Sequence, residues 1–339
     1  MKTRMIKMLI ISVVMVMMAI STTAILAEAK TINLKYAGLL PAKTTLAAPI
    51  DEWGKRVAER TKGQVKLTTY HSQALGKWLE YPKLSKSGLC EMFMAGGPSP
   101  GFALLGAGEL PLMFPSQRIG MDVMYGVYRK GLLSSVFEGN GVKFLFFMNN
   151  DPRKIWFSKK RITNFSQLKG LKVRGTTPVH IEIAKALGAT AVNISPADIY
   201  MALQRGTLDA AMNPSAGIFA LKQYEALKYV IWDPLCNDLI AVVMNLKVWN
   251  SLPAEVRAVM LEVNEEMKYW HIEQYESDQK YQQMVREKGL EIFHLNKEER
   301  EFLHSKLAPV AQGWVEKMES RGVPAKKLVD EMKRLSSDY

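Results

Sequence analysis

The sequence predicts an α/β protein with two lobes, and three observations support this fold class. From residue 31 onward, short β-rich runs alternate with stretches of helical periodicity, which is typical of βαβ units and a mostly parallel sheet. The turn cluster Asn149-Asn150-Asp151-Pro152 interrupts this series, and a second β/α series follows it. The length of 339 residues also exceeds the roughly 150 residues typical of one domain.

Residues 1–29 have the pattern of a secretory signal peptide rather than of the fold. Three basic residues precede the apolar run 8–20, and Ala27-Glu28-Ala29 is an A-x-A cleavage pattern. A membrane anchor is the alternative, but this run is short of the roughly 20 residues that cross a bilayer. We therefore expect an exported, periplasmic protein that begins at Lys30.

The first predicted lobe covers residues 30–150. In the helix expected over 44–63, Ile50, Trp53 and Val57 fall on one face and Gly63 ends the helix. Further helices are expected at 75–86 and 118–137, and strands at 32–37, 65–70, 90–95 and 142–147.

The second predicted lobe covers residues 151–237, and the chain then returns to both lobes. Strands are expected at 153–158, 171–174, 190–194 and 208–213, and helices at 178–187 and 195–205. The apolar run 239–246 predicts another strand. A continuous helix is expected over 253–288, about 54 Å long at 1.5 Å per residue, which would brace both lobes. We assign 238–277 to the first lobe, 278–305 to the second, and 306–339, with helices at 299–318 and 324–335, to C-terminal helices packed on the lobes.

The composition excludes several function classes. Hydrophobic residues make up 48% of the chain and charged residues 23%, which is ordinary for a globular protein. Five scattered histidines without an HxxxH pair predict no metal site, and we expect no cofactor. The net charge of +12 favours anionic partners, but export and lysines spread along helices argue against nucleic acid. Cys90 and Cys236 either pair in an oxidising compartment or pack as inert buried residues.

The candidate binding residues lie where strands end, because ligands of open α/β sheets bind beyond the carboxyl ends of strands. Arg174 ends one predicted strand and Gly175 leaves room beside it; Asn213 ends another, and Arg153 opens the second lobe. Two guanidiniums near one cleft are costly unless an anion neutralises them, and a carboxylate fits the guanidinium fork. A solvated charge or an internal ion pair is the alternative for each arginine.

The densest motifs are LKGLKVRG (168–175) and ALGATAVNISPADIYMALQRGTLDAAMNP (186–214), supported by 59–67, 73–76, 109–116 and 225–230. In their order and spacing the sequence resembles the periplasmic solute receptors of tripartite ATP-independent periplasmic (TRAP) transporters. The resemblance implies a periplasmic-binding-protein-like fold with hinge crossings and a long helix spanning both lobes. It also implies ligand capture by closure, without catalysis, and delivery to membrane permease subunits. It assigns the ligand carboxylate to Arg174, with Arg153 and Asn213 beside it.

Departures from the family pattern bear on the ligand. Met212 stands where the family often has Glu, Pro196 stands where an aromatic residue is common, and Met94-Ala95-Gly96-Gly97 carries no charge. These residues predict a carboxylate with an apolar or aromatic body, because a sugar acid would leave hydroxyls unpaired at roughly 1–3 kcal/mol each. The alternative is that Met212 and Met94 are core residues. The predicted ligand-binding set also contains Ala95, Gly38 and Asn237.

Two other functions stay open. An exported enzyme would need a nucleophile motif or two cleft carboxylates, whereas the sequence has no GxSxG, P-loop or GxGxxG unit and its strand ends carry Arg and Asn. A receptor that feeds a sensor instead of a permease is the other alternative. We expect a monomer.

Overall fold

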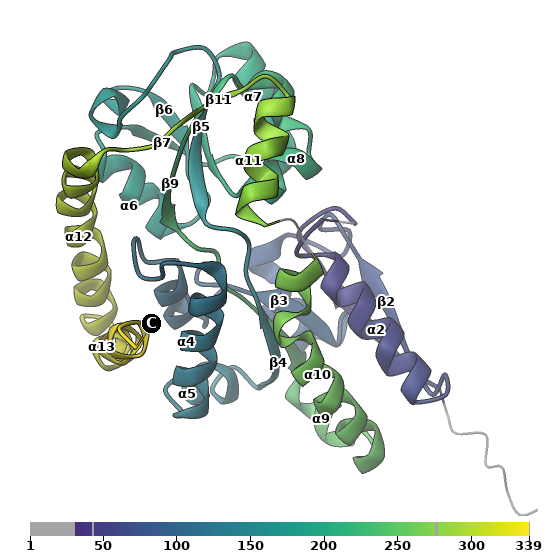
Figure 1. Cartoon of the computed structure of the whole chain (residues 1–339). Coiled ribbons are helices and arrows are strands. Elements are labelled where there is room, and N and C mark those ends of the chain that lie inside the picture. The colour runs from purple at the N-terminus through teal and green to yellow at the C-terminus, as the bar shows by residue number, and fades with distance from the viewer. Residues whose placement is uncertain (1–30, 43, 275–276, 339) are drawn as a thin grey trace, which may run out of the picture.

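The computed structural model describes residues 31–42, 44–274 and 277–338, and it has two β-sheets flanked by helices (Figure 1). The chain is thus an α/β protein with two lobes, as the sequence predicted. The predicted signal peptide lies outside the described residues.

The first sheet has the strand order β2-β1-β3-β10-β4. β10 runs against its neighbours β3 and β4, while β1 is parallel to β2 and β3. The bounds are β1 (Ile32–Ala37), β2 (Val65–Tyr70), β3 (Met92–Ala95), β4 (Val142–Met148) and β10 (Ile240–Asn245).

The second sheet has the order β11-β9-β5-β8-β6-β7. Here β5 is the reversed strand, since it is antiparallel to β8 and β9. The bounds are β5 (Arg153–Phe157), β6 (Lys172–Arg174), β7 (Thr190–Val192), β8 (Ala210–Asn213), β9 (Tyr229–Cys236) and β11 (Glu291–Phe293). Each sheet is therefore mostly parallel, with one reversed strand.

Each reversed strand comes directly after the chain crosses between the sheets. β4 leads through residues 149–152 into β5, and β9 leads through 237–239 into β10. A reversed strand begins at the sheet edge where its neighbours end, so its first residue lies among their carboxyl ends. Arg153 and Ile240 are these first residues. The distribution of strands supports the predicted lobe boundaries, which stay a prediction.

The helices on the first sheet pack through one apolar face. In α2, Ile50, Trp53 and Val57 are buried, as the periodicity predicted, and the Trp53 indole donates a hydrogen bond of 2.7 Å to the Asn264 side chain of α10. The stretch expected as one helix over 118–137 is divided into two. The bounds are α2 (Ala48–Arg60), η1 (Trp78–Glu80), α3 (Tyr81–Lys86), η2 (Ala103–Glu109), α4 (Gln117–Arg129), α5 (Ser134–Glu138), α9 (Leu246–Ser251) and α10 (Ala254–Gln274).

The helices on the second sheet are shorter. They are η3 (Phe165–Leu168), α6 (Pro178–Ala186), η4 (Pro196–Asp198), α7 (Ile199–Arg205), α8 (Ser215–Ala220), η5 (Gln223–Ala226) and α11 (Asp278–Glu287). α6 packs on β6 and β7, and α11 packs on β11.

The continuous helix predicted over 253–288 is wrong. α10 ends at Gln274, and α11 begins anew at Asp278, because the Ser277 hydroxyl caps its N-terminus by accepting a hydrogen bond from the Lys280 amide. Among the described residues, α12 (Lys297–Glu319) lies along both lobes, since it packs on α6 and on α13 (Ala325–Ser336), and α13 packs on α4 (Figure 1).

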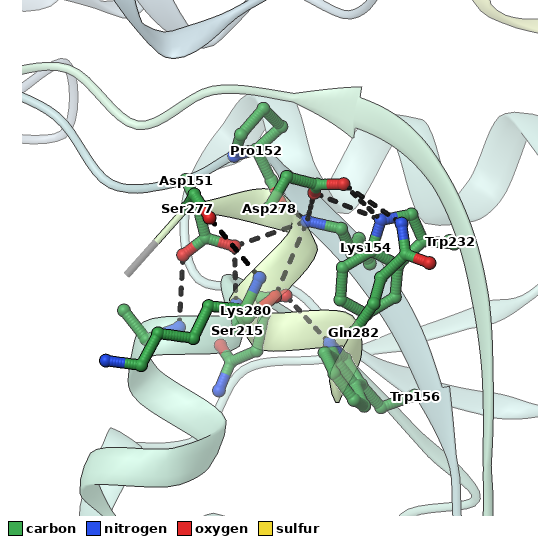
Figure 2. A network of polar contacts seen from close by, with 12 residues as sticks. Asp151, Pro152, Lys154, Trp156, Ser215, Trp232, Ser277, Asp278, Lys280 and Gln282 are labelled. Carbon is green, nitrogen blue, oxygen red and sulfur yellow. Dashed lines mark hydrogen bonds and ion pairs between the residues drawn. The ribbon is translucent and has the colours of Figure 1, made fainter. Parts of the chain in front are cut away.

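A buried lysine links the first crossing to the start of α11 (Figure 2). The Lys154 ammonium lies 3.3 Å from the Asp151 carboxylate and 3.6 Å from that of Asp278, and 4.4 Å above the centre of the Trp232 ring. Asp151 in turn accepts a hydrogen bond of 2.8 Å from the Ser215 amide at the start of α8. Contacts of a single side chain thus tie three segments together beside the hinge.

The two cysteines are buried and free. Burial raises the pKa of Cys90 to about 12 and raises that of Cys236 as well. The structure therefore has the packing alternative rather than the disulfide.

Candidate ligand-binding cleft

A cleft with about 780 Å³ of free space, its mouth included, lies where the carboxyl edges of the two sheets face each other. The second lobe contributes residues from β5, β6, β8, α8 and the loops after them. The first lobe contributes the loop after β1, η1, β3, η2 and the start of β10. The lining residues are Leu39, Leu40, Thr44, Thr45, Leu46, Trp78, Met94, Glu109, Asn150, Arg153, Arg174, Thr176, Thr177, Pro196, Asn213, Pro214, Ala216, Gly217, Leu221, Asp238 and Ile240.

Arg174 is a buried, positively charged residue of this cleft. Its side chain is buried, with 2% of the residue exposed, and it donates hydrogen bonds to the Ile194 carbonyl at 3.3 Å and to Asn213 Oδ1 at 2.5 Å. Among the described residues, no carboxylate forms an ion pair with it. Burial, and next the charge of Arg153, lower the pKa of Arg174 to about 9. An anion that entered the cleft would neutralise this buried charge.

Arg153 is held differently, although it lies close by. Its guanidinium makes a bidentate pair with Asp238, with Nε 2.7 Å from Oδ1 and Nη2 3.0 Å from Oδ2, and it donates to the Met212 carbonyl at 2.7 Å. Burial alone would raise the pKa of Asp238, but Arg153, His180 and Asn150 together outweigh burial and hold that pKa below its usual value. The internal ion pair considered for the arginines is thus present at Arg153.

Asn213 joins the two arginines. Its Oδ1 accepts from Nη1 of Arg174 and, at 3.2 Å, from Nη1 of Arg153. Its Nδ2 donates at 2.9 Å to Gln223, whose own amide donates at 3.1 Å to the Pro196 carbonyl. These bonds fix which way the Asn213 amide points, so the arginine forks are oriented before a ligand arrives.

The first lobe supplies the apolar wall. Leu39, Leu40, Met94 and Ile240 line the cleft together with Trp78, whose indole donates to the Met94 carbonyl at 3.1 Å. A Cβ at Gly96 would lie 3.0 Å from the Trp78 ring, so glycine there allows the indole to approach the strand end. The wall therefore presents a fixed aromatic ring and branched side chains.

Glu109 ends η2 and also lines the cleft. It is 2% exposed, and its Oε2 has no hydrogen-bond partner among the described residues. Burial raises the pKa of Glu109 to about 8, although a hydrogen bond with Thr177 opposes the shift. Burial and then Arg153 also lower the pKa of His180 well below its usual value, so that imidazole is neutral.

Nine residues were predicted to contact the ligand, and the structure places five of them in the cleft: Arg174, Arg153, Asn213, Pro196 and Met94. The other four do not line it: Met212, Ala95, Gly38 and Asn237. Met212 and Ala95 each neighbour a lining residue in a strand, so their side chains point to the opposite face, where both are core residues. Asn237 is buried beside Gly120, and the Gly38 amide bonds the Tyr70 carbonyl.

Sequence reasoning missed Asp238, Glu109 and Trp78. Asp238 had a readable signal, since it is a lone acid at the start of an apolar run. Trp78 had none, because it enters the cleft from a short 3₁₀ turn. Glu109 begins the supporting motif 109–116, but no local pattern showed that its side chain enters the cleft.

Within the described residues, no cluster of three or more His, Cys, Asp or Glu side chains is suited to a metal ion. No helix in the same part of the chain has the length and apolar character needed to cross a membrane.

Residues 36–318 match the bacterial extracellular solute-binding proteins of family 7. The chain belongs to this family. Its members include receptors of TRAP transporters, as the resemblance in the sequence implied.

Individual solute-binding proteins are similar over different lengths. One from Verminephrobacter eiseniae is 30% identical over 211 residues, which are 60% of this chain and 62% of that protein. The C4-dicarboxylate-binding periplasmic protein of Rhodobacter capsulatus is 26% identical over 89% of this chain and 92% of its own length. A marine metagenome TRAP protein specific for aromatic acids, solved with 3-hydroxybenzoate, shares the fold with a TM-score of 0.81 and 23% identity, covering 91% of this chain and 99% of that protein.

Proposed function

We propose that this solute-binding protein captures an organic acid with an apolar or aromatic body in the periplasm and delivers it to a TRAP-type permease. The observation that carries the proposal is the buried guanidinium of Arg174, which lacks a carboxylate partner among the described residues and opens onto the cleft. A ligand carboxylate supplies the missing charge and fits the fork in a bidentate manner.

The residues that line the cleft support a ligand whose part beyond the carboxylate is apolar or aromatic. Leu39, Leu40, Trp78, Met94 and Ile240 face the polar end of the cleft from the other lobe. An apolar body gains about 25 cal/mol per Å² of surface that it buries against them, whereas a hydroxyl placed there loses its hydrogen bonds. The aromatic acid of the marine metagenome protein is of the favoured kind, and the dicarboxylate of the Rhodobacter protein is not.

A thermal-shift screen followed by calorimetry tests this function. Benzoate and 3-phenylpropanoate are compared with benzamide, which keeps the ring without the charge, and with a sugar acid such as galacturonate. The acids with apolar bodies should raise the melting temperature, by the equivalent of about 2.7 kcal/mol at 100 times Kd, and benzamide should not. Stabilisation by the sugar acid alone would overturn the proposed ligand class. A receptor should also return its ligand chemically unchanged, as mass spectrometry would verify against the enzyme alternative.

The periplasmic location rests on the N-terminal pattern. N-terminal sequencing of the exported protein should begin near Lys30, whereas Met1 retained in a membrane fraction would support an anchor.

A further inference from the structure

We propose that Glu109 stands in the cleft as a neutral carboxylic acid and thereby makes the protein a receptor for singly charged acids. This inference rests on the proposed function and deepens it, because it fixes the charge of the ligand. It also makes ligand binding depend on a proton held by the protein.

The geometry of Glu109 is the first support. The carboxyl group lies at the cleft wall, it is almost fully buried, and Oε2 has no partner among the described residues. An ionised carboxylate in such a place would keep an unsatisfied, charged oxygen out of water, which is far less favourable than a protonated one. The Thr177 side chain is the hydrogen-bonding group beside it.

The neighbouring charges do not favour ionisation. Asp238 raises the pKa of Glu109 by more than Arg153 lowers it, and Arg153 already forms a bidentate pair with Asp238. The Cys236 thiol and the His180 imidazole also lie near Asp238 and Arg153, and burial keeps both groups uncharged. Glu109 also adjoins a second pocket with about 740 Å³ of free space, its mouth included, whose basic residues Lys317 and Arg321 lie on α12 and just beyond it.

The charge balance of the cleft follows. Arg153 and Arg174 contribute two positive charges, Asp238 contributes one negative charge, and neutral Glu109 contributes none. One positive charge is left, which a monocarboxylate neutralises. The second carboxylate of a dianion would be desolvated without a counter-charge. With Glu109 ionised, the cleft would be neutral before the ligand entered, and binding of any anion would be opposed.

Whether Glu109 carries a proton in the folded protein can be tested without a ligand. Because the pKa of Glu109 is higher in the folded protein than in the unfolded chain, the contribution of Glu109 to the stability of the wild type falls as the pH rises from about 4.5 to about 8. Glu109→Gln cannot ionise and escapes this loss. The melting temperature of E109Q relative to the wild type should therefore rise by several degrees from pH 5 to pH 8. Glu182→Gln, at an exposed site on α6, is the matched control and should track the wild type. A constant difference for E109Q would overturn the proposal whatever the ligand is.

A second experiment compares the affinity for benzoate with that for terephthalate, which adds a second carboxylate to the same ring. For a folded-state pKa of about 8 that the bound anion raises further, benzoate should bind roughly fourfold more weakly at pH 8.5 than at pH 6.5, a range that stays below the pKa of about 9 of Arg174. The same ratio should be close to one in E109Q, and terephthalate should bind more weakly than benzoate to the wild type at pH 6.5.

Each outcome separates the two proposals. A pH ratio that persists in E109Q would assign the titration to Arg174 and sink the role of Glu109, while the receptor function stood. Tighter binding of terephthalate at pH 6.5 would also refute single-charge selectivity. Failure of every apolar acid to bind would refute the proposed ligand class, and the ligand-free experiment would still decide the state of Glu109.

Discussion

Replacing Arg174 by alanine should abolish tight ligand binding without unfolding the protein. The guanidinium has five N–H donors. Two are engaged by Ile194 and Asn213, so the others are available for the two oxygens of a ligand carboxylate. Losing a charge-assisted, desolvated contact of this kind should cost about 2–5 kcal/mol, or roughly 30-fold to several thousand-fold in Kd.

Stability should change little in the absence of ligand. Burial and Arg153 already disfavour the charged form of Arg174, so its removal relieves an unfavourable charge while it leaves a cavity. Arg174→Lys should restore only part of the affinity, because an ammonium cannot form the fork.

Calorimetry with benzoate and melting curves with and without it measure both effects. Arg161→Ala is the matched control, since Arg161 is an exposed arginine of the same lobe that pairs with Glu291. If the folded Arg174→Ala variant binds within about threefold of the wild type, the carboxylate is held elsewhere and the assignment of the site is wrong.

Three further predictions concern the hinge. Arg153→Ala should destabilise the protein by about 3–5 kcal/mol in chemical denaturation, because it leaves Asp238 buried and unpaired; a loss below about 1 kcal/mol would show that the pair contributes little. Lys154→Met should lower the free energy of unfolding by about 1–3 kcal/mol, since Asp151 and Asp278 lose their shared cation, and Lys185→Met on exposed α6 should leave it unchanged. Small-angle scattering should show a smaller radius of gyration on saturation with ligand, and an unchanged profile would contradict capture by closure.

The fold could be predicted from short-range patterns where these patterns are unbroken. The strands at 32–37 and 65–70 were predicted to the residue because each is a continuous β-rich run beside a clear turn or helix end. β9 was missed because Asp233 and Pro234 lie inside it, and proline in a run argues against a strand. The break before α11 was missed although Ser277 and Asp278 are a readable cap, since the helical period continues on both sides.

The site was predictable only in part, for a related reason. Strand ends are local features, and they led to Arg174 and Asn213. The partner of Arg153 is Asp238, which lies 85 positions along the chain, and no local pattern shows that the two crossings meet. The apolar wall likewise comes from separate segments of the first lobe, so its composition could not be read from one motif.

The division of the cleft between the lobes has a kinetic consequence. Arg174 and Asn213 belong to the second lobe, and Leu39, Trp78 and Met94 belong to the first. Encounter is then governed by charge, so the association rate constant should fall with ionic strength and depend little on the ligand's body. The apolar wall acts after encounter, so each additional buried methylene should lengthen the residence time by roughly fourfold, from about 0.8 kcal/mol. One face of the cleft thus sets how fast an acid arrives, and the other sets how long it stays.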